Sequence, residues 1–177
     1  MLTGKNILLR ALEPEDIDII HKWENNPEIW KVSNTLTPFS RHIIAKYVES
    51  AHHDIHTEKQ LRLMIDLTSE NKSVGTIDLF EYDPFHRRAG IGILIAETTE
   101  RQKGYGAEAL QLITNYAFEV LDLHQLFCNI AESNKKSIRL FEKFGFHITG
   151  NKQDWLKTRG GFENEFFLQL INPLTLG

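Results

Sequence analysis

The residues of this chain best suited to hold a ligand form a short turn, Arg101-Gln102-Lys103-Gly104-Tyr105-Gly106-Ala107. An apolar run over 91–96 precedes the turn, and a helical pattern over 108–121 follows it. Such a junction directs several backbone N–H groups and the positive end of a helix dipole toward one place. The two glycines tolerate positive φ and allow close approach of the backbone, while Arg101 and Lys103 add positive charge. The turn is therefore predicted to bind an anion, most naturally a phosphate or a pyrophosphate.

The elements that must position this turn can be traced from hydrophobic periodicity and turn residues. We expect helices that begin at Pro14 and Ser40 and two more over 106–121 and 134–144, with an irregular stretch over 28–38. The expected strands lie at 6–11, 60–68, 74–82, 88–96, 125–131, 146–152 and 163–171. The strand over 60–68 alternates apolar and polar residues, which predicts one buried face. Short turns make the meander before the glycine turn antiparallel, whereas the crossover from 88–96 to 125–131 makes those two strands parallel. The prediction is an α/β protein of the α+β type with a mixed sheet.

Composition narrows the class of protein. The 177 residues fit one domain spanning 1–177, and the net charge of −4, without a block of Lys and Arg, argues against nucleic acid as a partner. The single cysteine, Cys128, lies in an apolar run, so no intrachain disulfide can form and a reducing compartment is implied. We find no secretory signal and no apolar stretch long enough to cross a membrane, so the expectation is a cytoplasmic protein without a membrane partner.

A histidine cluster, His52, His53 and His56, invites a metal-site interpretation because positions 52 and 56 would be one helical turn apart. No further His or Cys is near in sequence, and a solvated helix end explains the cluster equally well. We therefore expect no metal.

The glycine turn also fits a dinucleotide-binding pattern, Gly104-x-Gly106-x-x-Ala109, with Glu132 as the candidate ribose-binding acid. That fold repeats βαβ units, whereas here the pattern follows a meander in mid-chain and only one crossover unit is evident. A P-loop is excluded because no Gly-Lys-Ser/Thr follows the turn. A dinucleotide is thus the competing interpretation.

A wider set of residues carries a resemblance to a known family. The set joins the turn at 101–106, the helix opening Glu132-Ser133-Asn134 and the helix ending Leu140-Phe141-Glu142-Lys143-Phe144-Gly145-Phe146. Over nearly its whole length the chain resembles the GNAT family of N-acetyltransferases, most of all the bacterial spermidine/spermine N-acetyltransferases and the ribosomal-protein alanine acetyltransferases. The resemblance implies a mixed, mostly antiparallel sheet of six to seven strands flanked by about four helices.

The same resemblance implies acetyl-CoA as co-substrate. Its pantetheine arm would add like an extra strand beside Ile93, Leu94 and Ile95, using peptide groups left free where strands 88–96 and 125–131 splay apart. Asn134, assisted by Lys136, would reach the pantetheine or phosphate end, although a helix cap explains Asn134 equally well. The pyrophosphate would lie on the backbone of Arg101, Gln102, Lys103, Gly104, Tyr105, Gly106 and Ala107.

Acetylation of an amine needs a neutral amine, a polarised thioester carbonyl and a proton for the departing thiolate. We expect a backbone N–H, that of Leu94 or Ile95, to polarise the carbonyl. In the polyamine enzymes a tyrosine serves as general acid at the position of Phe141. Here either water or another hydroxyl supplies the proton, or the activity is low.

The base must come from the acidic residues. Asp78 and Glu81 correspond to acidic positions of the polyamine enzymes, and on a regular strand they would lie on opposite faces unless a bulge intervenes. Glu81 is the predicted base, acting through water, and His86 is a lesser candidate because its ordinary pKa suits proton relay.

The predicted function is therefore acetyl-CoA-dependent acetylation of a primary amine, with a polyamine or diamine as first choice. A peptide N-terminus of the ribosomal-protein type and an aminoglycoside-like amine are alternative acceptors. Phe141 motivates a different class, a non-catalytic acyl-CoA-binding sensor, and a homo-oligomer is left open. The residues predicted to bind the acceptor are Glu28, Trp30, Asp78 and Asp83.

Overall fold

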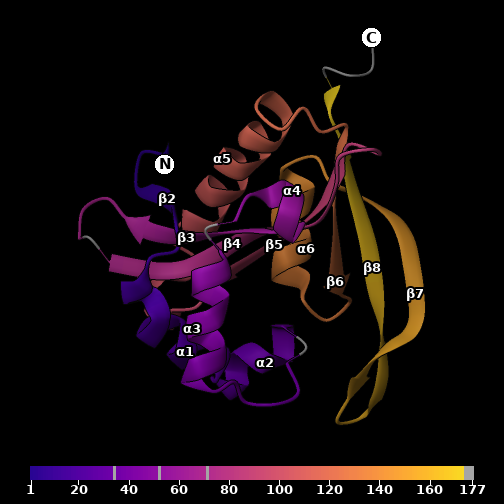
Figure 1. Ribbon diagram of the computed structural model, residues 1–177. Coiled ribbons are helices and arrows are strands. Elements are labelled where there is room, and N and C mark those ends of the chain that lie inside the picture. The colour runs from indigo at the N-terminus through magenta and orange to yellow at the C-terminus, as the bar shows by residue number, and fades with distance from the viewer. Residues whose placement is uncertain (34, 52, 71, 174–177) are drawn as a thin grey trace.

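The computed structural model describes residues 1–33, 35–51, 53–70 and 72–173 (Figure 1). Its strands form one eight-stranded sheet in the order β1-β2-β3-β4-β5-β6-β8-β7, and within the described residues every neighbouring pair is antiparallel except β5 with β6. The strands are β1 (Leu2–Thr3), β2 (Ile7–Ala11), β3 (Leu61–Leu67), β4 (Lys72–Asp83), β5 (Arg88–Ile95), β6 (Gln125–Ala131), β7 (His147–Thr158) and β8 (Gly161–Ile171). The helices are α1 (Ile17–Glu24), α2 (Pro27–Ser33), α3 (Arg41–Ser50), α4 (Ile55–Glu58), α5 (Tyr105–Glu119) and α6 (Lys135–Lys143), with 3-10 turns at Pro14–Asp16 and Thr98–Glu100.

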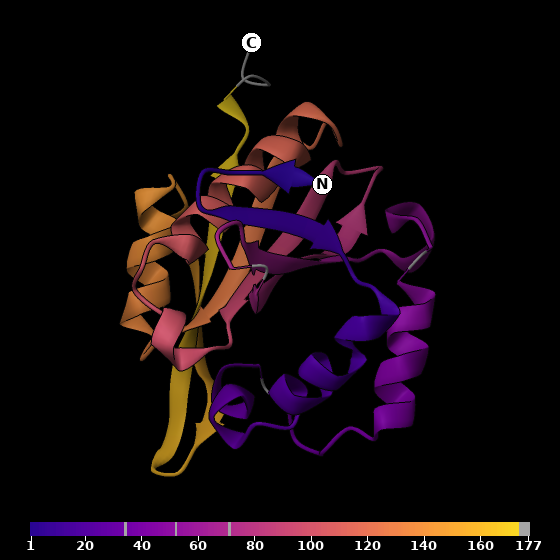
Figure 2. The same cartoon turned by 90° about the vertical axis from the view of Figure 1, so that its left-hand side faces the viewer.

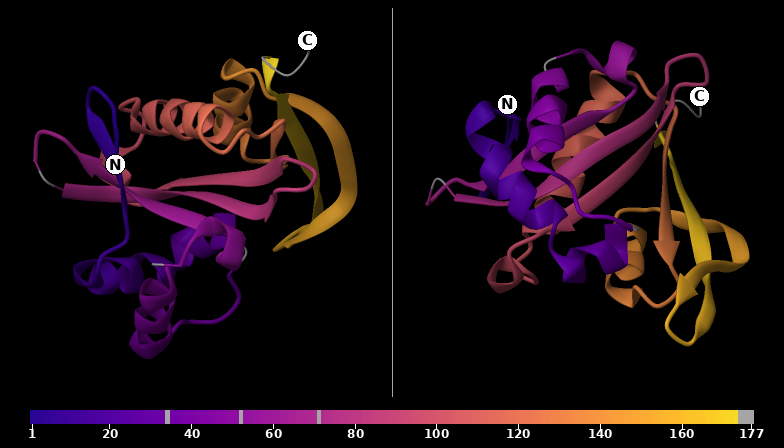
Figure 3. Two further views of the ribbon diagram at one scale, coloured as in Figure 1. Left: turned by 45° about the horizontal axis from the view of Figure 1, so that its top comes forward. Right: turned by 60° about the horizontal axis from the view of Figure 1, so that its bottom comes forward.

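Helices cover both faces of the sheet, as the edge-on view in Figure 3 shows. Helices α5 and α6 pack on one face, where residues such as Ile113 and Phe141 join the larger apolar core. Helices α1, α2 and α3 pack on the other face around the fully buried Met64. The β7–β8 hairpin lies at one end of the sheet (Figure 1), and β1 and β2 lie at the opposite end (Figure 2).

The predicted α+β class with a mixed sheet is confirmed, although the sheet has one strand more than expected. Residues 28–38 were expected to be irregular, but they begin inside helix α2. The side chain of Asn26 accepts a hydrogen bond from the Glu28 N–H, so the Asn-Asn-Pro sequence that ends α1 also starts the next helix. The short elements β1 and α4 were not predicted.

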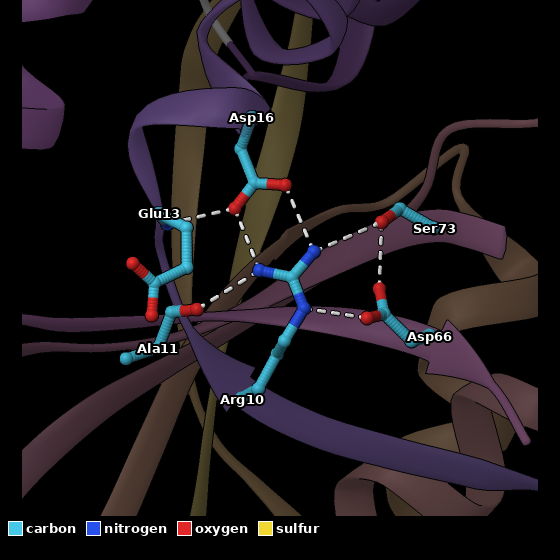
Figure 4. Close-up of polar contacts among 6 residues, drawn as sticks. All are labelled: Arg10, Ala11, Glu13, Asp16, Asp66 and Ser73. Carbon is cyan, nitrogen blue, oxygen red and sulfur yellow. Dashed lines mark hydrogen bonds and ion pairs between the residues drawn. The ribbon is translucent and has the colours of Figure 1, made fainter. Parts of the chain in front are cut away.

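Strand β3 is buried on both faces, and the expectation of one buried face is wrong. Its second face carries Arg62, Met64 and Asp66, which lie beneath the α1–α3 layer. Asp66 joins a polar network around Arg10 that Figure 4 shows, in which the guanidinium contacts both Asp16 and Asp66. This network ties the 3-10 turn at the start of α1 to β2 and β3.

The edges of the sheet are β1 and β7. β1 is two residues long, whereas β7 has twelve residues and pairs with β8 in three short runs. Irregularities between Ile148 and Gly150 and between Lys152 and Leu156 separate these runs, and Asp154 takes a φ of 47° within the second.

Candidate active site

The parallel strands β5 and β6 separate soon after they pair. Their register joins only Arg88 with Gln125, Ala89 with Leu126 and Gly90 with Phe127. Beyond Gly90, the described part of β5 has no partner on the β6 side, while β6 continues to Ala131 in register with β8. The predicted splay between these strands is therefore confirmed, and it leaves an open strand edge over 93–95.

A close contact between β4 and β5 positions this open edge. Gly75 lies opposite Ile95, and a Cβ atom added to Gly75 would stand 1.9 Å from the Leu94 carbonyl oxygen. Only glycine allows the two backbones to approach this closely. The path of β5 next to the crevice thus depends on a residue of the preceding strand.

The glycine turn closes the open end of the splay. Gln102 and Gly104 take left-handed φ values of 65° and 92°, and turns that contain such residues can gather successive N–H groups into an anion-binding concavity. Gly106 does not use the positive φ that a glycine tolerates; it lies in the first turn of α5, where its missing side chain leaves room next to Ile93. Helix α5 therefore starts, with its positive dipole end, at the predicted anion site.

A pocket of about 400 Å³ joins the turn to the strand edge. Ten of the predicted cofactor-binding residues line it: Ile93, Leu94, Ile95, Arg101, Gln102, Gly104, Gly106, Ala107, Asn134 and Lys136. Arg101 also donates from Nε to the Ile95 carbonyl oxygen at 2.8 Å, which connects the turn to the end of β5.

Lys103 and Tyr105 do not line this pocket. The Lys103 Nζ lies 2.8 Å from Glu100 Oε2, and Lys72 Nζ lies 2.8 Å from the other carboxylate oxygen. Hydrogen bonds from Lys103 and then Lys72 lower the pKa of Glu100 to about 2. Tyr105 packs against the larger core. Lys103 therefore has a carboxylate partner within the chain in place of a free positive charge at the pocket.

Asn134 caps a helix and also lines the pocket. Its Oδ1 accepts from the Ser137 N–H at 3.2 Å and caps α6, while the same residue lines the pocket next to the glycine turn. The cap fixes the residue in place, so the start of α6 stands opposite the start of α5.

A second pocket, of about 220 Å³, continues through the splay and is called the crevice below. Phe141, Cys128, Asn129 and Glu165 are among the residues that line it. The Phe141 ring is buried and packs edge-on against Phe146 with ring centroids 5.0 Å apart. Burial raises the pKa of the Cys128 thiol to about 12, so this thiol is not an acid or nucleophile at neutral pH.

A third pocket, the rim pocket, adjoins β6 on the side away from α5 and α6. Glu81 and Asp83 line it together with Phe127, Lys152 and other residues. Glu81 has a φ of 49° at an irregularity in the β4–β5 register between Phe80 and Asp83. This is the bulge that the sequence left open, and it turns Glu81 toward the rim pocket.

Asp78 lies elsewhere, in a cluster with Arg62 and Glu24 called the Arg62 cluster. Arg62 Nε is 2.6 Å from Asp78 Oδ1, and its Nη1 is 2.8 Å from Glu24 Oε1. The guanidinium also lies over the Tyr47 ring, and burial raises the pKa of Tyr47 to about 12. Trp30 donates its indole N–H to the Glu24 carbonyl oxygen at 2.6 Å.

The predicted acceptor-binding residues therefore do not lie together in one pocket. Asp83 lines the rim pocket, where its carboxylate also caps the turn at His86 and contacts Arg88. Among the described residues, Asp78, Glu28 and Trp30 line none of the three pockets.

Sequence reasoning missed one group of polar residues between the crevice and the rim pocket. Asn129, Lys152 and Glu165 come from β6, β7 and β8, and they meet because these three strands are neighbours in the sheet. Alternation along each strand could have placed each residue on a face, but the register between strands was not available from the sequence.

The histidine cluster gives no metal site among the residues that the structure describes. His53 contacts Glu58 and His56 packs edge-on against Tyr82, whereas His52 lies outside the described residues. In the same described ranges, no helix has the length and apolar character needed to cross a membrane.

The fold of this chain, a mixed sheet with one splayed parallel pair and a glycine turn at its open end, is similar to that of a solved N-acetyltransferase. Residues 6–147 match the family model described as acetyltransferase (GNAT) domain, and the chain belongs to this family. The dinucleotide interpretation of the glycine turn is therefore wrong.

Individual proteins that are similar to this chain are also acetyltransferases. Spermidine N(1)-acetyltransferase of Escherichia coli is 27% identical over 164 residues, which cover 93% of this chain and 85% of that protein. A crystal structure of Vibrio cholerae spermidine N-acetyltransferase with CoA and spermine has a TM-score of 0.85 at 24% identity, and the match covers 95% of this chain and 96% of that one. A dodecameric structure of the Vibrio cholerae enzyme has a TM-score of 0.80 at 23% identity, with 98% of both chains covered.

Proposed function

We propose that this acetyltransferase carries the acetyl group of acetyl-CoA to a primary amine of a diamine or polyamine, and that residues 1–177 act as one domain. The observation that carries the proposal is the open β5 edge over 93–95, which shares one pocket with the glycine turn. An extended donor with a phosphate at one end fits this arrangement, because peptide groups can pair with its amides and the helix start can hold its phosphates. The name of the Escherichia coli relative supports the acceptor class.

Each part of the donor has residues of this chain that suit it. Arg101, Gln102, Gly104 and the start of α5 would hold the pyrophosphate, and Asn134 with Lys136 would stand opposite. The backbone N–H of Leu94 or Ile95 would polarise the thioester carbonyl. When bound, acetyl-CoA supplies the activated acyl group, and this chain supplies position and exclusion of water.

The proposal also assigns the general base and the general acid of the reaction. Glu81 would accept the proton of the amine through water, since its bulge turns it toward the rim pocket. Phe141 cannot give a proton, so water would protonate the thiolate. Such an arrangement retains the part of the rate that positioning provides.

Release of the CoA thiol, measured across a panel of amines, tests the function. The panel should hold a diamine, a polyamine, a monoamine, a peptide with a free N-terminus and an aminoglycoside. We expect turnover with the diamine and the polyamine. Turnover only with the peptide or the aminoglycoside would replace the acceptor class, and tight CoA binding without turnover on any amine would support the sensor alternative.

The proposal includes the oligomeric state and the location of the protein. The dodecameric Vibrio cholerae enzyme supports a homo-oligomer, which sedimentation of the purified chain would test. A cytoplasmic location is supported by the single, buried Cys128, which suits a reducing compartment, and localisation of a fluorescent fusion would test it.

A further inference from the structure

A lysine side chain of β7 reaches across β8 and occupies a site that recognises an ammonium group. Lys152 Nζ lies 2.8 Å from Glu165 Oε2 and 2.7 Å from Asn129 Oδ1. Its ammonium also stands 5.2 Å from the centre of the Trp155 ring. A carboxylate, an amide oxygen and an aromatic ring around one nitrogen are groups that bind alkylammonium ions.

The carboxylate of this site depends on a positive partner. The Glu165 side chain is 9% exposed, whereas that of Lys152 is 34% exposed. A buried carboxylate is costly unless a positive charge accompanies it. The lysine can move toward solvent on its flexible stem, so another ammonium ion could take its place.

The site stands between the crevice and the rim pocket. Asn129 lines both pockets, Glu165 lines the crevice and Lys152 lines the rim pocket. An amine that enters from the rim pocket, where Glu81 and Asp83 lie, meets this cluster before it reaches the crevice.

The chemistry of the reaction restricts which nitrogen can bind there. The nitrogen that attacks the thioester must be neutral, because its lone pair forms the new bond to carbon. A positive charge recognised by Glu165 must therefore belong to a different nitrogen of the same acceptor. A diamine or polyamine has such a nitrogen, and a monoamine does not.

We propose that Glu165, with Asn129 and Trp155, binds the second ammonium group of the acceptor, and that Lys152 fills this site until the acceptor arrives. Glu165 is then a specificity-determining residue, and Lys152 is an internal competitor that lowers the apparent affinity for the acceptor. This inference rests on the proposed function, since it assumes that the acceptor is an amine.

The test compares steady-state kinetics of a diamine and a monoamine of equal chain length, at about pH 8 so that carboxylates stay ionised. Lys152→Met should lower KM for the diamine roughly fivefold to tenfold, because it removes the competitor. Glu165→Gln should raise that KM on the order of tenfold or more, since a charged hydrogen bond is lost. Neither variant should change KM for the monoamine by more than about twofold.

Lys5→Met is the matched control, because it removes the same charge from an exposed lysine between β1 and β2, at the other end of the sheet. It should leave both KM values unchanged. In the double variant with Glu165→Gln, Lys152→Met should no longer lower KM, since the two residues act at one site.

The outcomes separate this inference from the proposed function. Absence of turnover by the unaltered protein on every amine contradicts the proposed function. Normal turnover combined with an unchanged diamine KM in Lys152→Met, or with equal effects of Glu165→Gln on diamine and monoamine, overturns the ammonium site alone. A fall in unfolding midpoint for Lys152→Met without any change in KM would assign the pair a purely structural role and also overturns it.

Discussion

Arg62 contacts Asp78 through two nitrogen atoms beneath the α1–α3 layer. Arg62 Nε lies 2.6 Å from Asp78 Oδ1, and Arg62 Nη2 lies 3.4 Å from Asp78 Oδ2. Its remaining terminal nitrogen binds Glu24 on α1, so one cation serves two carboxylates. Burial of Arg62 would lower its pKa, but Asp78, Tyr47 and Glu24 raise it overall. Helix α1 is thus attached to β3 and β4 by this guanidinium.

Arg62→Met should lower the free energy of unfolding by about 3–5 kcal/mol, because it leaves two partly buried carboxylates without their cation. Urea unfolding followed by circular dichroism measures this loss. Arg41→Met, which removes an arginine from an exposed pair with Asp18, is the control and should leave the midpoint unchanged. Equal unfolding midpoints for the two variants would contradict the prediction that the Arg62 cluster stabilises the fold.

The Arg10 network makes stability depend on pH in the acidic range. Burial acts to raise the pKa of Asp16, but hydrogen bonds from Arg10 and from the Glu13 N–H, with the charge of Arg10, lower it overall. A carboxylate whose pKa is lowered by folding stabilises the protein above its unfolded pKa, at about 3.9, and this contribution is lost as the pH falls through the folded pKa.

Asp16→Asn should therefore reduce the unfolding midpoint at neutral pH, and the two midpoints should approach each other as the pH falls below the unfolded pKa of about 3.9. Urea titrations at a series of pH values measure the difference. A difference that stays constant, or grows, as the pH falls would refute the assignment.

Gly75→Ala should destabilise the protein by about 1–3 kcal/mol and weaken CoA binding, because a Cβ atom there collides with the Leu94 carbonyl oxygen and pushes β5 away. Calorimetric titration with CoA and thermal unfolding measure the two effects. Gly92→Ala is the matched change on β5, where the new Cβ would stand 3.7 Å from the Phe80 ring, and it should fold with little loss. Equal unfolding temperatures for both variants would show that the close contact does not position β5.

Phe141→Tyr places a hydroxyl at the crevice, where the proposed reaction needs a proton donor. Turnover should rise, up to about a hundredfold, since general acid catalysis contributes on this scale. Phe144→Tyr adds the same hydroxyl one turn later on the chain, outside the lining of the crevice, and should leave turnover unchanged. An equal response of the two variants would indicate that the thiolate needs no side-chain acid.

Thr114 offers a test of packing that is independent of activity. Its hydroxyl is the one buried side-chain polar atom without a hydrogen-bond partner within the described residues. Thr114→Val should raise the free energy of unfolding by about 1 kcal/mol, since it removes an unsatisfied group and retains the shape. Thr114→Ser keeps the hydroxyl and loses a methyl group, so it should lower stability; a lower stability for the valine variant would contradict the explanation.

The sequence predicted those features that depend on neighbouring residues. Strand β6 has the expected bounds, Ser40 caps α3 through its hydroxyl, and Gly145 ends α6 with a φ of 85°. Each depends on periodicity or on a local turn, which a single stretch of chain contains. The glycine turn belongs to the same group.

The sequence alone did not predict features that depend on contacts between residues far apart in the chain. The polar face of β3 was expected to meet solvent, but Arg62 and Asp66 are covered because α1 and α3 pack over them. Likewise the Lys152–Glu165 pair depends on the β7–β8 register, which passes through two irregularities. Tertiary packing decides such contacts, and local pattern does not reveal them.

The irregular pairing of β7 has a consequence for the behaviour of this protein at high concentration. A long, regular edge strand would present a row of N–H and C=O groups on which further chains could stack without limit. In this protein the twelve-residue edge is divided into runs of at most three paired residues, and the other edge, β1, has only two. Both margins of the sheet are thus poor templates for fibril growth, although the interior of the sheet remains open to a strand-like ligand between β5 and β6.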